Sequence, residues 1–350
     1  NITDLAGNAL PNTEPGTDQT YLVDNSAPST TSFERNTPAT SPTNADTLVF
    51  RVTFSEDVAS VDLADFAVSG TTATVSNVNQ VSADVYDVTV SGGDLAGLDG
   101  TVGLDLAGGQ NITDLAGNAL PNTEPGTDQT YLVDNSAPST PVADLQAASD
   151  TGTSDSDDIT NDTTPTIEIS TEPGATVEWF IDGVSQGTTT ADGGGVATFT
   201  PSSDLAPGTY AFTAQSTDDA GNTSAASNAL NVTIDTAAPS TTSFERNTPA
   251  TSPTNADTLV FRVTFSEDVA SVDLADFAVS GTTATVSNVN QVSADVYDVT
   301  VSGGDLAGLD GTVGLDLAGG QNITDLAGNA LPNTEPGTDQ TYLVDNSAPS

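Results

Sequence analysis

The 350-residue chain carries 49 acidic residues against four basic ones, a net charge of −45, and it contains no histidine, cysteine or methionine. All four basic residues are arginines, so lysine is absent as well. These absences exclude catalytic triads, thiol nucleophiles, zinc sites built on cysteine or histidine, and lysine chemistry, while the charge makes nucleic acid and anionic lipid poor partners.

Internal repetition divides the chain. Residues 241–350 repeat residues 30–139 without a change, and residues 1–29 are identical to residues 111–139. We call the repeated sequence module A and the intervening residues 140–240 module B. Residues 1–29 are then the C-terminal strand segment of a preceding module A, and we expect the chain to be a window from a longer array. Identical copies favour a function that depends on the number and spacing of modules.

Taken in chain order, each module is predicted to consist of short strands about eight to twelve residues apart, in which apolar and polar residues alternate. Alternation predicts one buried and one solvated face, and the spacing is typical of an immunoglobulin-like sandwich. We therefore predict an all-β chain of tandem immunoglobulin-like β-sandwich modules arranged end to end as a rod. The apolar positions are Leu48, Phe50, Val52 and Phe54; Tyr86, Val88 and Val90; Val102, Leu104 and Leu106; Ile167 and Ile169; Val177, Trp179 and Ile181; Tyr210, Phe212 and Ala214; and Leu230, Val232 and Ile234.

Two stretches of module B, "DTGTSDSDDITNDTTPTIEISTEPGATVEWFIDG" and "GTYAFTAQSTDDAGNTSAASNALNVTIDTAAP", resemble the bacterial immunoglobulin-like repeats of giant Gram-negative surface adhesins. Module A, with "FSEDVASVDLADFAVSG" and "ITDLAGNAL", resembles a second immunoglobulin-like class found in surface-layer and very large surface proteins. The resemblance implies type I secretion, a cell-surface or biofilm location, and calcium between modules. The chain shows neither an adhesive tip domain nor a calcium-binding nonapeptide secretion signal.

Acidic loops are predicted to meet where one module follows another. In an immunoglobulin-like sandwich the loops after the second and sixth strands lie at the pole that faces the preceding module. In module A these loops carry Glu56, Asp57 and Asp114, and the arriving linker carries Asp24. Calcium takes six to eight oxygen ligands, so we predict a calcium site at this junction. The alternative is that these aspartates only form turns and cap strand ends.

The same reasoning applies to the other junctions, because an aspartate precedes each further linker and acidic loops follow it. We expect the A-to-A and B-to-A junctions to share one geometry, with Glu267, Asp268 and Asp325 replacing the residues of the first copy. The remaining predicted calcium ligands of the junctions are Asp134, Asp235 and Asp345 in the linkers and Glu172, Asp218 and Asp219 in module B.

Module B also contains a run of aspartates between two predicted strands, namely Asp150, Asp155, Asp157, Asp158 and Asp162. Like charges this close together favour a bound counter-ion. We predict that calcium occupies this run as well, with an ordinary acidic loop as the alternative.

Three functions compete. Identical repeats and short linkers favour a structural spacer, a stalk or filament of an extracellular adhesin that contacts its neighbouring modules and a partner on a cell surface or in a matrix. Immunoglobulin-like modules that bind glycan or protein directly are the alternative. A glycosidase with paired carboxylates is disfavoured because no carboxylate pair stands apart from the repeat, so we predict no enzymatic activity. No stretch approaches the roughly 18 apolar residues of a membrane span.

Overall fold

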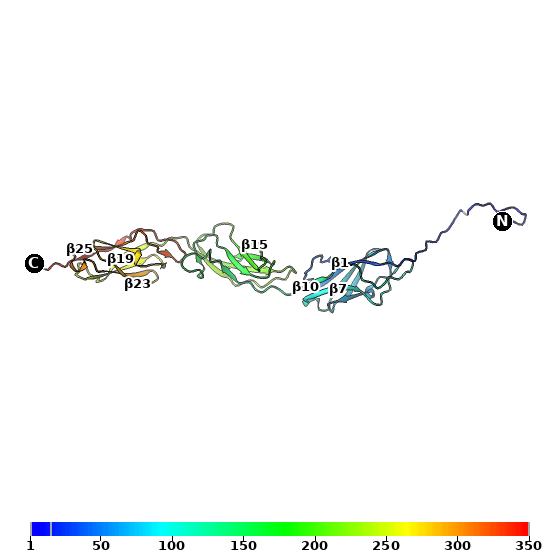
Figure 1. The fold of residues 1–350 in the computed structure, drawn as a ribbon, viewed down its shortest axis with the longest axis horizontal. Helices are drawn as coiled ribbons and strands as arrows, with labels where there is room; N and C mark the ends of the chain where they lie inside the picture. Colours follow the sequence, from blue (N-terminus) through cyan, green and yellow to red (C-terminus); the bar gives the residue numbers. More distant parts are fainter. Residues whose placement is uncertain (1, 15, 349–350) are drawn as a thin grey trace. The chain divides into compact units, whose positions relative to one another are not determined.

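A computed structural model describes residues 2–14 and 16–348. The chain forms two compact units, one of residues 1–136 with 220–222, the other of residues 137–219 with 223–350, and each is described by itself. Apart from four short 3₁₀ turns, all the regular elements of the described residues are β-strands (Figure 1). No helix in this part of the chain is long and apolar enough to cross a membrane.

The first copy of module A is a β-sandwich. One sheet has five strands in the order β5-β6-β2-β1-β9 and the facing sheet has three in the order β10-β7-β4, while β3 pairs with β8. The elements are β1 (Thr30–Thr37), β2 (Thr47–Phe54), β3 (Val58–Ala59), η1 (Leu63–Asp65), β4 (Phe66–Ser69), β5 (Thr74–Ser82), β6 (Val85–Ser91), η2 (Leu95–Gly97), β7 (Gly100–Leu106), β8 (Thr113–Asp114), β9 (Thr127–Asp128) and β10 (Tyr131–Val133).

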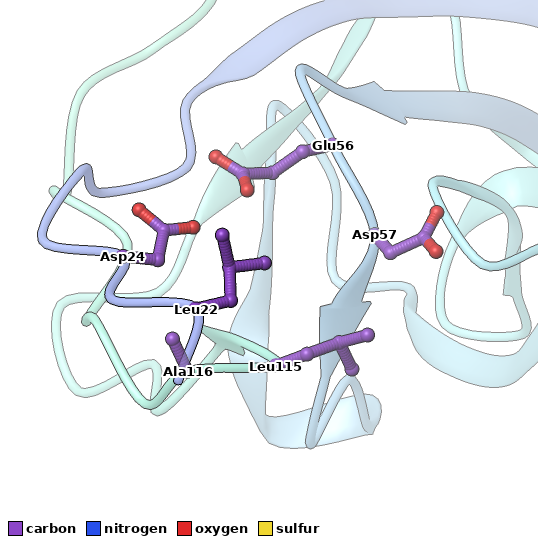
Figure 2. Close-up of a pocket in the computed structure, with 6 residues that line it drawn as sticks. All are labelled: Leu22, Asp24, Glu56, Asp57, Leu115 and Ala116. Atoms are coloured by element: carbon purple, nitrogen blue, oxygen red, sulfur yellow. The ribbon is translucent and has the colours of Figure 1, made fainter. Parts of the chain in front are cut away.

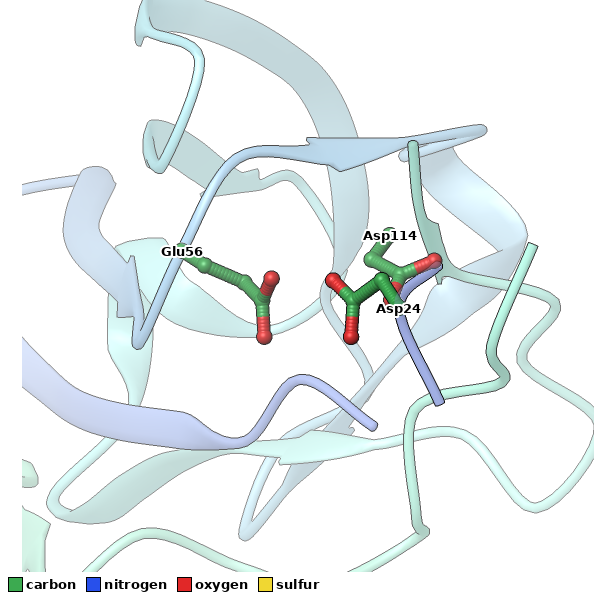
Figure 3. Close-up of side chains that lie close together, drawn as sticks. All are labelled: Asp24, Glu56 and Asp114. Carbon is green, nitrogen blue, oxygen red and sulfur yellow. The ribbon is translucent and has the colours of Figure 1, made fainter. Parts of the chain in front are cut away.

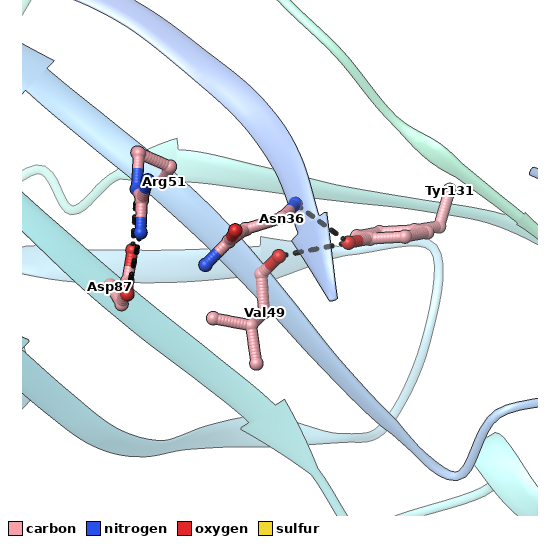
Figure 4. Close-up of polar contacts among 5 residues, drawn as sticks. All are labelled: Asn36, Val49, Arg51, Asp87 and Tyr131. Carbon is pink, nitrogen blue, oxygen red and sulfur yellow. Dashed lines mark hydrogen bonds and ion pairs between the residues drawn. The ribbon is translucent and has the colours of Figure 1, made fainter. Parts of the chain in front are cut away.

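Alternation along the strands produces the core of this module, as the sequence predicts. Every second residue of β2 is buried, from Leu48 to Phe54, and β6 and β7 contribute Val88 and Leu104 from the two facing sheets. Most outward-facing positions of β2 and β6 are polar. Arg51 of β2 forms a two-pronged ion pair with its cross-strand neighbour Asp87, at 2.9 and 3.0 Å (Figure 4).

Tyr131 fastens the closing strand β10 to the rest of module A. Its ring is fully buried and packs edge-on against Phe50 at 5.0 Å between ring centroids. Its hydroxyl lies 2.8 Å from the carbonyl oxygen of Val49 and accepts the N–H of Asn36 at 3.1 Å (Figure 4). A buried ring with a satisfied hydroxyl links both sheets at one point.

Module B is a second sandwich, with a three-stranded sheet β11-β13-β16 and a five-stranded sheet β12-β18-β17-β14-β15. Trp179 is 1% exposed, stacks on Phe199 at 5.6 Å and donates its indole N–H to Thr189, so the predicted core position is confirmed. The strands are β11 (Ala143–Leu145), β12 (Ile159–Thr160), β13 (Ile167–Ser170), β14 (Thr176–Ile181), β15 (Val184–Thr190), β16 (Val196–Phe199), β17 (Gly208–Thr217) and β18 (Leu230–Ile234).

The second copy of module A repeats the strand order of the first, with sheets β23-β24-β20-β19-β27 and β22-β25-β28 and the pair β21-β26. Its elements are β19 (Thr241–Thr248), β20 (Thr258–Phe265), β21 (Val269–Ala270), η3 (Leu274–Asp276), β22 (Phe277–Ser280), β23 (Thr285–Ser293), β24 (Val296–Ser302), η4 (Leu306–Gly308), β25 (Gly311–Leu317), β26 (Thr324–Asp325), β27 (Thr338–Asp339) and β28 (Tyr342–Val344).

Module B and the second module A, which belong to the same unit, are in contact through a tight loop. The Thr151 hydroxyl donates to the carbonyl oxygen of Ala327 at 2.6 Å. Gly152, at a φ of +102°, lies so close to Leu326 that an added Cβ would fall 2.1 Å from its carbonyl oxygen. Only glycine fits this backbone approach without displacement.

Candidate functional site

Three carboxylates meet where the N-terminal segment reaches the first module A. Asp24, Glu56 and Asp114 each place an oxygen within 4.8 Å of the other two, and their side chains face one another (Figure 3). We call this group the first triad. Asp24 is exposed, Glu56 is partly buried and Asp114 is buried.

Local structure explains how each member of the first triad is positioned. Ser55, beside Glu56 in the turn after β2, donates its N–H to the carbonyl oxygen of Ser29 and accepts the N–H of Ser29 at its hydroxyl, which ties the linker to that turn. Asp114 lies on β8, which pairs with β3. Asn118 donates its side-chain amide to the carbonyl oxygen of Asp24 at 3.2 Å.

The Asp114 carboxylate also organises its own turn. It accepts the N–H groups of Ala116 at 2.9 Å and Asn118 at 2.7 Å, and the side-chain amide of Asn118 at 2.7 Å. The Asn118 side chain is the main cause that lowers the pKa of Asp114, so this carboxylate is ionised at neutral pH. The turn role foreseen as the alternative is therefore real, and it holds the carboxylate within the triad.

Asp57 belongs to the same hollow but not to the triad. The hollow is lined by Leu22, Asp24, Glu56, Asp57, Leu115 and Ala116, and Figure 2 shows the Asp57 side chain pointing away from Asp24 and Glu56. Because Asp57 directly follows Glu56 in the chain, the two side chains leave the backbone in different directions. Its counterpart Asp268 is likewise not a member of the corresponding triad.

A second triad, Asp235, Glu267 and Asp325, forms where module B meets the second module A, again with oxygens within 4.8 Å of one another. Asn329 donates to the carbonyl oxygen of Asp235 at 2.9 Å and to the carboxylate of Asp325 at 2.8 Å. Burial is the main cause that raises the pKa of Glu267, followed by repulsion from Asp235 and Asp325. The aspartate of the preceding linker therefore meets the same two loops in both copies of module A.

The predicted ligands of the junction between the first module A and module B fall in different units, Asp134 in the first and Glu172, Asp218 and Asp219 in the second. Asn222, which clusters with the first unit, donates its side-chain amide to the carbonyl oxygen of Asp134 at 2.8 Å. A metal site at this junction stays a prediction, as does one at Asp345, whose carboxylate accepts the N–H of Ser347.

The aspartate run of module B contains an unusual side chain. Asp150 is 5% exposed, and neither of its carboxylate oxygens has a donor at hydrogen-bonding geometry. Burial is the main cause that raises the pKa of Asp150, and repulsion from the carboxylates of Asp157 and Asp158 raises it further. The nearby backbone amides of the same two residues offset only part of this increase. Asp158 adopts a left-handed φ of +59°, and burial raises its pKa as well. Asp155 is exposed.

Sequence reasoning missed two further groups of carboxylates. Asp105, Glu124 and Asp128 of the first module A, and the identical Asp316, Glu335 and Asp339, bring their oxygens within 4.8 Å of one another. Glu124 also accepts the N–H of Leu106 at 3.1 Å. Glu124 and Asp128 lie near Asp105 of β7 only because β9 pairs with β1 of one sheet and β10 then pairs with β7 of the other. These are long-range pairings, and the local sequence gives no signal of them.

With the fold and the carboxylate groups established, comparisons with known proteins define the class. The described residues form tandem immunoglobulin-like sandwiches, and residues 137–236 match the family model described as a bacterial Ig-like domain. Module B is thus similar to a bacterial Ig-like domain over nearly its whole length. The sequence matches no curated protein.

Solved structures of low similarity accompany this match. A biofilm-associated protein BSP domain has 20% identity and a TM-score of 0.22, over 56% of this chain and 28% of that chain. A tetra-tandem repeat from the extending region of a large adhesion protein has 16% identity and a TM-score of 0.26, over 91% of this chain and 73% of that chain. Sidekick-1 immunoglobulin domains 1–5 have 11% identity and a TM-score of 0.36, over 91% of this chain and 58% of that chain.

Proposed function

We propose that the chain is a spacer segment of a secreted bacterial surface adhesin, in which calcium at the module junctions stiffens an array that supports cell adhesion or a biofilm matrix. The observation that carries the proposal is the recurrence of one triad, Asp24, Glu56 and Asp114 in one unit and Asp235, Glu267 and Asp325 in the other. In each case a linker aspartate meets two loops of the module that follows it. A cation bound there would join the linker to that module.

The charge balance supports a bound cation. In the described residues, the side-chain ion pairs are Arg51 with Asp87 and Arg262 with Asp298, so neither triad is neutralised by an arginine. Two members of the first triad and all three members of the second are at least partly buried, which weakens screening by water and salt. Three clustered carboxylates without a counter-charge destabilise the aligned junction.

The donor set favours calcium over other metals. Carboxylates alone provide the ligands, which suits hard cations and not zinc or copper. Three carboxylates supply up to six oxygens, and calcium tolerates an irregular shell completed by water, whereas magnesium demands near-octahedral geometry. Asp150 offers a further place, because a buried carboxylate without a hydrogen-bond donor is most simply satisfied by a cation.

Mass action gives the size of the stabilisation that calcium would provide. A cation that binds only the aligned, folded state adds RT ln(1 + [Ca]/Kd), about 2.7 kcal/mol per site at a hundredfold excess over Kd. This is large beside the roughly 5–15 kcal/mol stability of an ordinary domain. An array in millimolar calcium would be stiff, and the same array in a low-calcium cytosol would be flexible, which suits passage through a secretion channel.

The test compares melting temperature and maximum dimension by X-ray scattering, in calcium and in chelator, for the full chain and two variants. Asp24→Asn with Asp235→Asn removes one carboxylate per triad while the amide oxygen can still accept the N–H that closes each linker turn. Glu34→Gln with Glu245→Gln removes the same charge from exposed positions.

We expect calcium to raise the melting temperature and lengthen the wild-type chain and the control variant, but to act much less on the linker variant. If chelator changes neither quantity in the wild type, or if both variants respond like it, calcium stiffening is wrong. A metal-independent fibre would then be the better account.

A further inference from the structure

An asparagine at the same place in module B and in both copies of module A contacts the linker that precedes the module. It follows an Ala-Gly pair in the turn DLAGN of module A and in the turn DDAGN of module B. It is partly buried in every case, and its side-chain amide donates to the backbone carbonyl oxygen of the linker aspartate. The bonds, each within one unit, are Asn118 to Asp24 at 3.2 Å, Asn222 to Asp134 at 2.8 Å, and Asn329 to Asp235 at 2.9 Å.

The turn that carries the asparagine has the same backbone conformation in both kinds of module. The residue before the asparagine has a φ of +92°, +97° or +90°, at Gly117, Gly221 and Gly328 respectively. This left-handed conformation favours glycine. In the second module A, Asn329 donates to the carbonyl oxygen of Asp235 and also to the carboxylate of Asp325. A primary amide has two N–H groups, so both are used and the direction of the side chain is fixed.

The module that the linker leaves holds the same aspartate from the other side. The N–H of Asp134 donates to the carbonyl oxygen of Thr43 at 3.0 Å, and the N–H of Asp235 donates to that of Thr160 at 2.8 Å. Both threonines are buried. The backbone of one linker residue therefore donates to the preceding module and accepts from the asparagine of the following turn. These bonds involve neither the side chain of the linker aspartate nor a cation.

The asparagine bond recurs more widely than the carboxylate triads. Within the described residues, the linker aspartates that belong to a triad are Asp24 and Asp235, whereas the asparagine bond also forms at Asp134. The bond follows the sequence of a module A at Asp24 and Asp134 and that of module B at Asp235. A backbone acceptor is present whatever side chain the linker residue carries, so the bond does not depend on the kind of module that precedes it.

We propose that Asn118, Asn222 and Asn329 are positioning residues, which align each module on the preceding linker without metal and whichever kind of module comes before. The asparagine fixes the linker backbone, and the linker aspartate is then free to present its carboxylate to the loops of the following module. Calcium, where it binds, adds to an alignment that is already present. Alignment by asparagine thus goes beyond the proposed calcium stiffening, and measurements in chelator separate the two.

Pairs of spin labels across a junction measure this alignment, because the chain has no native cysteine. Val81→Cys with Val184→Cys spans the junction between the first module A and module B, and Val184→Cys with Val292→Cys spans the next one. All three valines are at least half exposed. In chelator, double electron–electron resonance should give a narrow distance distribution for each pair.

Removing one asparagine should affect only its own junction. Asn222→Ala should broaden the first distance distribution and leave the second unchanged, and Asn329→Ala should do the reverse. The loss of one neutral hydrogen bond, about 1 kcal/mol, should raise the population of undocked linkers about fivefold. A role confined to the structure of the turn would instead lower the melting temperature of the altered module and leave both distributions narrow.

Two matched variants complete the test, both in chelator. Asn79→Ala, at an exposed position of β5 away from the junctions, should change neither distribution. Asp235→Asn removes a carboxylate from the second triad but keeps the backbone carbonyl, so the second distribution should stay narrow. Narrow distributions in both Asn222→Ala and Asn329→Ala would overturn the proposal. Equal broadening by Asp235→Asn and Asn329→Ala would overturn it as well, because alignment would then depend on the aspartate side chain.

Discussion

Replacing Glu267 by glutamine should change stability with opposite signs in chelator and in calcium. Without a cation, the Glu267 carboxylate lies within 4.8 Å of those of Asp235 and Asp325. At this distance two unit charges repel by about 0.9 kcal/mol in water and by about 3.5 kcal/mol at an effective dielectric constant of 20. Glu267 is partly solvated, so the lower figure applies to each of its two pairs. Glu267→Gln should therefore stabilise the chelated chain by about 1–2 kcal/mol, or roughly 4–8 °C.

In saturating calcium the same substitution removes a charged ligand. If the dissociation constant rises tenfold, the stabilisation falls by about 1.4 kcal/mol, so the variant should melt below the wild type. Calorimetry in the two buffers measures both signs, and the exposed Glu245→Gln should move the melting temperature little in either. A shift of the same sign in calcium and in chelator would refute the argument, because it would mean that Glu267 acts through packing or turn structure.

Other perturbations follow from the cores and from the pKa shifts. Trp179→Ala should cost about 3–5 kcal/mol in urea unfolding followed by circular dichroism, because it empties the centre of module B. Tyr131→Phe should cost about 1–3 kcal/mol in the same assay, because it leaves buried backbone groups without the hydroxyl. In chelator, melting temperature should rise as the pH falls from 7 toward about 5, since the raised pKa values of Glu267 and Asp150 mean that the folded state takes up protons first. At lower pH this gain should reverse as Asp114, whose pKa is lowered, becomes protonated; calcium should abolish the rise near pH 5, and a melting temperature that only falls on acidification would contradict it.

Strand periodicity made most of the fold predictable from sequence. Alternation identified the buried faces of β2 and β14, and two of the predicted apolar positions, Tyr210 and Leu230, are only partly buried at the margin of their core. The prediction works because a strand with one wet face must repeat its pattern every two residues. Such a pattern says which face is buried but not which strands are neighbours.

Long-range pairing explains what the sequence did not reveal about the sites. Asp62 and Asp65, close to the predicted calcium loop, form a capping box around a 3₁₀ turn instead, and Asp65 also accepts the N–H of Asn111. Asp105 and Glu124 meet only because the chain passes from β9, in the five-stranded sheet, to β10, in the three-stranded sheet that contains β7. Proximity along the chain therefore does not distinguish an aspartate that caps a turn from one that joins a carboxylate group, and it gives no signal for the group around Asp105.

The burial of Trp179 has a practical consequence for measurement. Because it is the chain's single tryptophan, selectively excited tryptophan fluorescence reports the unfolding of module B alone, whereas circular dichroism reports all modules together. The two copies of module A share one sequence, so any difference between their transitions belongs to their neighbours and not to their own strands. The unlabelled chain thus contains an optical probe for separating the intrinsic stability of one sandwich from its coupling to the next.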